Sequence, residues 1–472
     1  MSCTAAPPAA DCRPAGRRSE RRRHLALAVI ATGMFMVVLD TTIVNLALPA
    51  IRADFAAPVS ALTWVVDAYT LSFAALIMLG GAASDRLGAR TVYLAGLALF
   101  VGASGACAMA TGTGALITAR FAQGMGAALF LPASLALVRQ TFEDPQGRAR
   151  AVAAWALIAS VGAALGPLAG GMLVDALGWR SVFLINLPFG LAALLSSIVF
   201  IEGRRGDGSR AFDAAGQLAS AVALAATCFV AVELPERGLG AVEVWAPALL
   251  ALAAAAAFVM AERRAAQPMV PLAWFGDRTF AAMTGVAVLL NLSFYGMLFA
   301  LSIHLQDARH LSARAAGQAL LPMAISLTAG NALSHRLSGR IPPQRLMVGA
   351  LSAAALAVLL AASALTAGAA LPWVHAGLML MGLGNAASVA PMLSSALEQV
   401  PAGQAGIASG LLNAMRQTGS LLGVALAGAA VALARDADSA LWTVAAVSSA
   451  AYASAALLTW HGARPRDPAR PG

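Results

Sequence analysis

Fourteen apolar runs, each about twenty residues long, constrain this chain more than any other feature of its sequence. A helix needs about 20 apolar residues to cross the hydrocarbon core of a bilayer. The chain is 60% hydrophobic and 11% charged, whereas soluble domains carry about 25% charged residues. We therefore predict an all-α polytopic membrane protein with fourteen transmembrane helices. The runs cover 24–50, 62–83, 91–110, 113–138, 151–175, 181–201, 214–234, 243–262, 280–302, 316–334, 345–367, 371–395, 406–434 and 438–460.

The arginines indicate the topology. If the N-terminus faces the cytoplasm, the two tails and the cytoplasmic loops hold 23 arginines, the opposite loops hold six, and two lie inside the runs. Because basic residues accumulate on the cytoplasmic side of membrane proteins, we expect both termini in the cytoplasm and a multi-pass protein of the cell membrane. The same distribution attributes the net charge of +9 to topology and lipid contact, and not to a nucleic acid partner.

The chain also repeats weakly along its length. The glycines of 162–171 return 257 positions later in 419–428, and the turn at 85–90 is echoed 250 positions later at 335–340. Parallel repeats of this kind are typical of transporters, with the substrate site between the halves near the bilayer midplane. We predict a cytoplasmic tail at 1–23, a six-helix bundle at 24–201, a linker with two inserted helices at 202–262, a second six-helix bundle at 263–460, and a tail at 461–472.

The segment GGAASDRLGAR lies at the cytoplasmic end of the second run. Gly81 allows a neighbouring helix to approach closely, and Gly88 permits a tight turn into the next helix. Asp85 can cap or pair, while Arg86 and Arg90 anchor the turn at the membrane interface. Taken alone, the segment also fits an ordinary basic turn.

The segment RFAQGMGAA begins with Arg120, which lies inside the fourth run. An arginine inside a membrane span costs about 2.5–3.5 kcal/mol on insertion scales, so its presence indicates a function or a partner. The alternative is that its side chain reaches the membrane interface.

The segment GAALGPLAGG lies in the fifth run. Gly162, Gly166 and Gly170 are spaced by four residues and form a flat face for a neighbouring helix, and Gly171 follows directly. Pro167 removes one backbone hydrogen bond and bends the helix, which then can act as a pivot. Ordinary packing of small residues is the alternative interpretation.

These three motifs, in this order, resemble the major facilitator superfamily. LDTTIVNLALP at 39–49 and GIASGLLNAMRQTGSLLG at 406–423 resemble helices 1 and 13 of its fourteen-span drug:proton antiporters, the EmrB/QacA type. The resemblance implies a major facilitator fold of 6+2+6 helices that exports small amphipathic or hydrophobic compounds by alternating access, driven by inward proton flow. Thr91 stands where the family's loop motif usually has a second basic residue, and His335 stands where the second half would need an acid to repeat it.

The resemblance also implies roles for particular residues. It implies proton coupling for Asp40 in the first run and for Arg120 in the fourth. It implies control of conformational switching for the loop residues Gly81, Asp85, Arg86, Gly88 and Arg90. It links the direction of antiport to Gly162, Gly166, Pro167, Gly170 and Gly171.

A count of helical rise places three charged residues at one level. At about 1.5 Å per residue, Asp40 lies about 8 Å below the outer face of the membrane, Asp67 about 8 Å and Arg120 about 10 Å. Because unpaired charges at this depth are costly, we expect Arg120 to pair with Asp40, with Asp67, or with both. A carboxylate whose partner changes can carry protons, so Asp40 is the expected carrier and Asp67 its rival.

Further polar residues inside the runs are candidates for a substrate cavity, although Arg416 fits a structural role equally well. They are Asn45, Gln123, Asn413, Arg416 and Gln417. We expect no metal or cofactor, no ATP as energy source, since no Walker-type loop is present, and a monomer that is not an enzyme. The alternatives are export of one endogenous metabolite, proton-coupled uptake, and a membrane sensor that does not transport.

Overall fold

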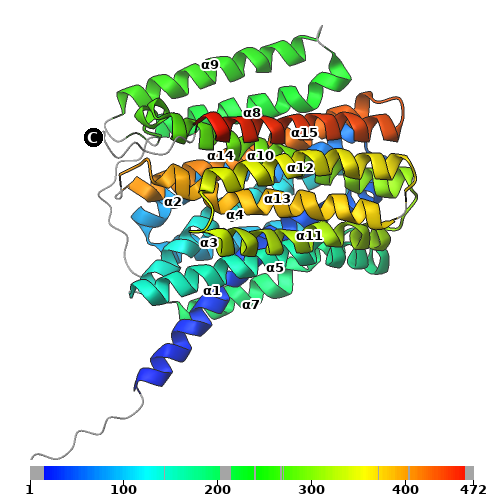
Figure 1. The fold of residues 1–472 in the computed structure, drawn as a ribbon. Helices are drawn as coiled ribbons and strands as arrows, with labels where there is room; N and C mark the ends of the chain where they lie inside the picture. The colour runs from blue at the N-terminus through cyan, green and yellow to red at the C-terminus, as the bar shows by residue number, and fades with distance from the viewer. Residues whose placement is uncertain are drawn as a thin grey trace, which may run out of the picture.

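The computed structural model describes residues 15–462, apart from 143, 202, 204–213, 239–240, 266–267, 269, 370 and 402–403. Every regular element among these residues is helical, and the long helices lie side by side in one bundle (Figure 1). The expected tails and linker fall largely outside the described residues. The first part of the chain forms α1 (Ala15–Phe55), α2 (Val59–Leu87), α3 (Ala89–Ala108), α4 (Thr113–Thr141), α5 (Pro145–Leu177), α6 (Ser181–Leu184) and α7 (Asn186–Phe200).

The inserted helices and the second part of the chain follow in the same up-and-down order. They are α8 (Ala214–Arg237), α9 (Val242–Arg264), the 3₁₀ turn η1 (Leu272–Gly276), α10 (Arg278–Ile303), the π-helical turn η2 (His304–Ala308), α11 (Ala313–Leu337), α12 (Pro343–Thr366), α13 (Leu371–Leu397), α14 (Ala405–Leu433) and α15 (Ala437–Gly462).

Thirteen helical segments of the described chain are long and apolar enough to cross a membrane, with α6 and α7 counted as one. The run expected at 316–334 also forms a helix, α11, but its composition falls short of a membrane span. Gln318, Asn331 and His335 interrupt its apolar surface, and it packs between α5 and α13. Thirteen spans are therefore supported by composition, and the fourteenth remains a prediction.

The inserted helices α8 and α9 lie on the outside of the bundle (Figure 1). Only 17% of the α8 span and 11% of the α9 span are buried, and large apolar side chains such as Leu249 and Leu252 are exposed. A surface of this kind is unfavourable in water and suits contact with lipid. α8 packs against both α2 and α14, so it covers a place where the first and second halves of the chain meet.

The two six-helix sets repeat one packing pattern. α1 packs against α5 as α10 packs against α14, and α2 packs against α4 as α11 packs against α13. Glycines allow the first of these pairs to approach closely in both halves. A Cβ atom at Gly166 would overlap the hydroxyl of Thr42 on α1, and one at Gly423 would overlap the carbonyl of Leu292 on α10. The weak repeat in the sequence thus corresponds to a repeated helix crossing.

Contacts between the halves gather at the end of the bundle opposite the start of α1, which we call the far side. Arg52 pairs with Asp307 at 3.1 Å. The Ser302 hydroxyl donates to the carbonyl of Asn45 at 2.6 Å, and the backbone amide of Arg314 donates to Asp175 at 3.2 Å. These contacts hold the far side closed.

The seam between α2 and α14 widens toward the opposite end, the tail side. Residues 18 apart are five turns apart and lie on one face of a helix. On α14, a Cβ atom at Gly428 would overlap Thr63 of α2, whereas one at Gly410 would meet nothing within 4 Å. On the other seam, Gly171 of α5 abuts Ala313 of α11, and nearer the tail side Asn331 of α11 donates to Ser160 of α5 at 3.4 Å. The bundle is therefore closed on the far side, and the α2–α14 seam is open on the tail side.

Candidate functional site

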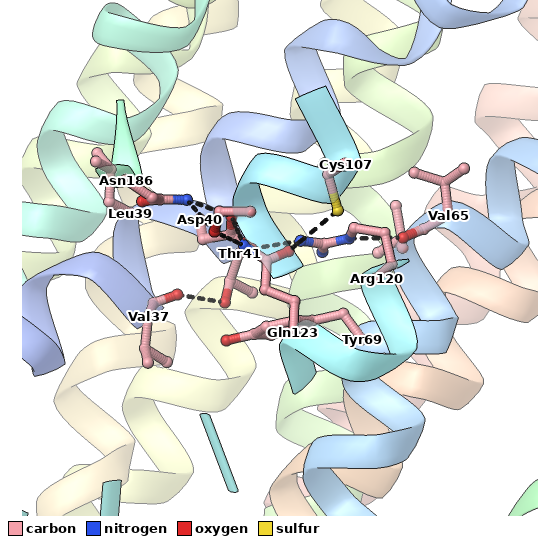
Figure 2. Close-up of polar contacts among 12 residues, drawn as sticks. Val37, Leu39, Asp40, Thr41, Val65, Tyr69, Cys107, Arg120, Gln123 and Asn186 are labelled. Atoms are coloured by element: carbon pink, nitrogen blue, oxygen red, sulfur yellow. Dashed lines mark hydrogen bonds and ion pairs between the residues drawn. The ribbon is translucent and has the colours of Figure 1, made fainter. Parts of the chain in front are cut away.

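A buried ion pair between Asp40 of α1 and Arg120 of α4 lies at the centre of the first half (Figure 2). The Nη1 of Arg120 donates to the Asp40 carboxylate at 2.5 Å, and both side chains are at most 1% exposed. Breaking a buried pair by removing one partner is strongly destabilising, because it leaves an uncompensated charge. The expectation that Arg120 pairs with an acid at its own depth is confirmed for Asp40.

Amide and hydroxyl groups surround the Asp40 carboxylate. Gln123, three residues after Arg120 and on the same face of α4, donates to Asp40 at 2.9 Å and to the Ser104 hydroxyl at 2.8 Å. Asn186 at the start of α7 donates to the same carboxylate oxygen at 3.0 Å. Three donor residues from two helices besides α1 thus donate hydrogen bonds to the Asp40 carboxylate.

The guanidinium of Arg120 makes further contacts. Its Nε donates to the carbonyl of Val65 at 3.0 Å, and its Nη1 donates to Gln123 at 2.7 Å. The ring of Tyr69 lies 4.5 Å from the guanidinium carbon and that of Phe183 lies 5.8 Å from it. Arg120 therefore joins α1, α2 and α4 at one point.

Asp67 does not join this network, although it lies at a similar depth. Its side chain is fully buried, and neither carboxyl oxygen has a hydrogen-bond partner among the residues that the structure describes. One turn away on α2, Leu71 packs with Cys228 of α8 and Leu421 of α14. Asp67 therefore points toward the seam that α8 covers. Of the three pairings that the sequence left open for Arg120, the structure shows the pairing with Asp40.

Asn186 and Ser104 are the members of the network that the sequence analysis missed. Asn186 lies where the sixth run breaks between α6 and α7, two residues before Pro188. A buried polar residue beside a proline in an apolar run is a signal that sequence inspection can use. Ser104 carries no comparable signal, since serine is common in helix contacts of membrane proteins.

The loop motif forms a one-residue turn between α2 and α3. Gly88 adopts φ +90°, a backbone conformation that strongly favours glycine, so the predicted tight turn is confirmed. Arg90 donates to the carbonyl of Ile198 at 2.9 Å and ties α3 to α7. Asp85 and Arg86 are exposed at the tail side, and Gly81 faces Pro132 of α4.

The glycine–proline motif of α5 faces two partners. Gly162, Gly166 and Gly170 abut α1 within the first half. Gly171 abuts Ala313 of α11, and a Cβ atom at Gly317 of α11 would overlap the carbonyl of Pro167. The bend in α5 is therefore placed where the first half meets the second.

The five cavity candidates separate into two groups. Gln123 and Asn45 are at most 2% exposed, and Gln123 donates to Asp40 and Ser104, so a cavity role for these two residues stays a prediction. Asn413, Arg416 and Gln417 lie together on α14 and are partly exposed. Among the described residues, no group of three His, Cys, Asp or Glu side chains is arranged to hold a metal ion.

Comparison with known proteins identifies the family to which this geometry belongs. The family model described as Major Facilitator Superfamily matches residues 30–424. The chain belongs to the Major Facilitator Superfamily. It is therefore a multi-pass membrane protein of a transporter family and not an enzyme.

Two curated members of the superfamily resemble this chain over most of its length. The "Methylenomycin A resistance protein" of Bacillus subtilis (strain 168) is 36% identical over 441 residues, which are 92% of this chain and 93% of that protein. The "Multidrug resistance protein Stp" of Mycobacterium tuberculosis (strain CDC 1551 / Oshkosh) is 37% identical over 412 residues, covering 87% and 76%. Both relatives are named for resistance to antibiotics or drugs.

A solved structure of the superfamily confirms the fold alone. The crystal structure of a D-xylose-proton symporter aligns with a TM-score of 0.65 at 14% identity, covering 93% of this chain and 98% of that one. Because that protein is named as a symporter, the shared fold does not decide the direction in which this member transports.

Proposed function

We propose that this chain is a proton-coupled antiporter that exports small amphipathic or hydrophobic compounds, including drugs or antibiotics, by alternating access. The observation that carries the proposal is the buried Asp40–Arg120 pair, an ionisable site at the core of the first half. The resistance proteins named above, each at least 36% identical to this chain, support export as the direction.

In the proposed cycle, the closed far side corresponds to the stage after proton release. Asp40 is then ionised, because Arg120 and the amides of Gln123 and Asn186 all stabilise its charged form. Opening of the far side moves α1 against α4, separates Asp40 from Arg120 and lets it take a proton. Neutral Asp40 then permits the return to the tail-side-open arrangement, where the pair reforms and the proton leaves.

The finer architecture belongs to the same proposal. α11 is the fourteenth span, the two halves flank α8 and α9 as 6+2+6 helices, and the tail side is cytoplasmic, as in the EmrB/QacA type. The proton gradient supplies the energy without ATP or a cofactor, and one chain suffices. The loop around Gly88 and the α5 motif around Pro167 act as switch and pivot, since each lies where helices must shift.

Drug-susceptibility profiling of a hypersensitive strain tests the function directly. Expression of the protein should raise the inhibitory concentration of at least one amphipathic compound. Expressing cells should also accumulate less of that compound than control cells, and an uncoupler should abolish this difference. Everted vesicles should take up the same compound when a proton gradient is imposed. The proposal is wrong if no compound shifts and no proton-dependent uptake occurs in vesicles that contain the folded protein.

A second candidate is an exporter dedicated to one endogenous metabolite. One relative is named for resistance to a single antibiotic, methylenomycin A, and the other for resistance to many drugs. A susceptibility profile confined to one scaffold would favour the dedicated exporter, whereas shifts across unrelated scaffolds would favour multidrug efflux. The remaining alternatives are uptake by symport and a sensor role. Uptake into everted vesicles corresponds to export from the cell, so proton-driven uptake of the compound in the vesicle experiment would exclude both.

A further inference from the structure

A polar stripe on α14 faces the space between the halves. At 100° per residue, Asn413, Arg416 and Gln417 cover about 100° of the helix surface. On one side of the stripe, Gly419 and Gly423 abut α10 of the same half. On the other side, Leu421 packs with α2 and α8 in the same apolar cluster as Leu71. The stripe therefore lies between the contact with its own half and the contact with the opposite half.

Arg416 carries a positive charge that no acid of the described residues balances. Its Nε donates to Asn291 on α10 at 3.4 Å, and no carboxylate of the described residues lies within ion-pair distance. Acids between 278 and 460 are restricted to Asp307, Glu398, Asp436 and Asp438, all at the ends of helices. The second half therefore has an arginine near mid-depth and no acid within its spans to pair with it.

An unbalanced guanidinium at this depth calls for an anion from outside the chain. Arg416 lies 11 residues into α14, about 17 Å from its start and so near the middle of a span. An arginine in this position is costly unless it is paired or used for binding. The planar guanidinium binds a carboxylate through two parallel hydrogen bonds, and Asn413 and Gln417 supply amide donors on the same stripe.

The stripe also lies near the proton-coupling network. Tyr295, one turn after Asn291 on α10, is the titratable side chain that interacts with Arg416. Tyr295 is in turn close enough to Tyr69 to interact with it electrostatically, and Tyr69 stacks on Arg120. Tyr295 therefore lies near both Arg416 and Tyr69, so an anion on Arg416 would lie close to α2, the helix that carries Tyr69.

We propose that Arg416, with Asn413 and Gln417, forms the subsite that binds an acidic group, such as a carboxylate, of the exported compound. The inference rests on the proposed export function and names the substrate class for it: amphipathic compounds with an acidic group. Compounds without such a group still pass, but they lack this contact and bind less tightly.

The test uses two dyes that differ in one group. Rhodamine 110 has a free carboxylate, and rhodamine 123 is its methyl ester. In proteoliposomes of the full-length protein, the wild type should transport the carboxylate with the lower KM. Arg416→Gln should raise the KM for the carboxylate at least ten-fold and change that for the ester less than two-fold. Arg416→Lys should retain part of the preference for the carboxylate dye, since lysine keeps the positive charge but cannot form the two parallel hydrogen bonds of a guanidinium.

Arg435→Gln is the matched control, because Arg435 is exposed in the loop after α14 and its loss changes the net charge equally. Retained transport of the ester demonstrates that Arg416→Gln is folded. The subsite is overturned if Arg416→Gln reduces transport of both dyes equally. It is also overturned if the wild-type protein binds neither dye, or binds both equally well. The subsite is also overturned if transport through Arg416 depends on chloride and shows no preference for the carboxylate dye. That result would indicate that Arg416 binds an inorganic counter-ion. Proton-driven export of the ester without carboxylate preference refutes the subsite and leaves the export function standing.

Discussion

The two halves repeat one packing of helices but not one polar interior. In the first half, Arg120 is held by Asp40, Gln123 and a backbone carbonyl, and two aromatic rings flank it. In the second half, Arg416 has a long hydrogen bond to Asn291, and no acid of the described residues pairs with it. Glycines preserve the shared helix crossings, while the charges differ. The first half therefore holds a paired buried charge, as the proposed proton coupling requires, and the second presents an arginine without an acid, as the proposed subsite requires.

Arg120→Gln gives the largest expected effect on stability. It leaves Asp40 buried without its cation, which should cost about 3–5 kcal/mol of unfolding free energy. The double variant Asp40→Asn/Arg120→Gln should recover most of that loss, because neither charge remains. Unfolding titrations in detergent measure all three proteins. A double variant no more stable than Arg120→Gln would show that the pair is not what stabilises this site.

Arg416→Gln removes the corresponding arginine of the second half, and its effect on stability should differ from that of Arg120→Gln. Because Arg416 pairs with no acid of the described residues, its loss leaves no acid without its cation. Arg416→Gln should therefore lower the unfolding free energy by less than about 1 kcal/mol, or raise it. The same detergent titration measures it. A loss as large as that of Arg120→Gln would reveal a hidden partner and remove the difference between the halves.

Valine at Gly166 or Gly423 should disturb both halves alike. In each case the added side chain enters backbone or side-chain atoms of the partner helix, and overpacking of this kind costs about 1–3 kcal/mol. Gly410→Val is the control on α14, since nothing lies within 4 Å of its Cβ position. Thermal unfolding monitored by size-exclusion chromatography reports the three effects. Sensitivity of only one half would contradict a shared crossing.

Arg52→Gln should give the smallest effect. Its pair with Asp307 is about half exposed to solvent, and exposed pairs contribute about 0–1 kcal/mol. Its loss should favour opening of the far side by at most about five-fold. Thiol labelling of Thr63→Cys, which faces Gly428 at the closed seam, measures that opening in a background without native cysteines. Arg237→Gln, whose pair lies within α8, should not change the labelling rate.

The sequence predicts the depth of a residue in the membrane better than the direction in which its side chain points around the helix. Apolar runs and a fixed helical rise placed Asp40, Asp67 and Arg120 at one depth, and Arg120 does pair with Asp40. Depth does not reveal which way a side chain points, so the sequence could not decide between Asp40 and Asp67 as the partner of Arg120. It also could not show that Gln123 donates to Asp40. Gly88 was predictable because a one-residue turn demands one backbone conformation.

α11 and Asn186 illustrate the remaining limit. α11 packs between α5 and α13, so the predicted fourteenth span does not require an apolar surface of the usual length. Asn186 reaches Asp40 only because α6 and α7 break at one point and direct its side chain inward. Both features depend on tertiary packing, which no single stretch of sequence encodes.

Substrate-driven proton movement in proteoliposomes is the most direct test of proton coupling through Asp40. A pH-sensitive dye inside the vesicles reports protons when a substrate gradient is imposed on wild type, Asp40→Asn and Asp67→Asn. We expect wild type and Asp67→Asn to move protons against the substrate, and Asp40→Asn to bind substrate without moving protons. Proton movement that persists in Asp40→Asn and is lost in Asp67→Asn would contradict the account and assign the proton to the α8-covered seam.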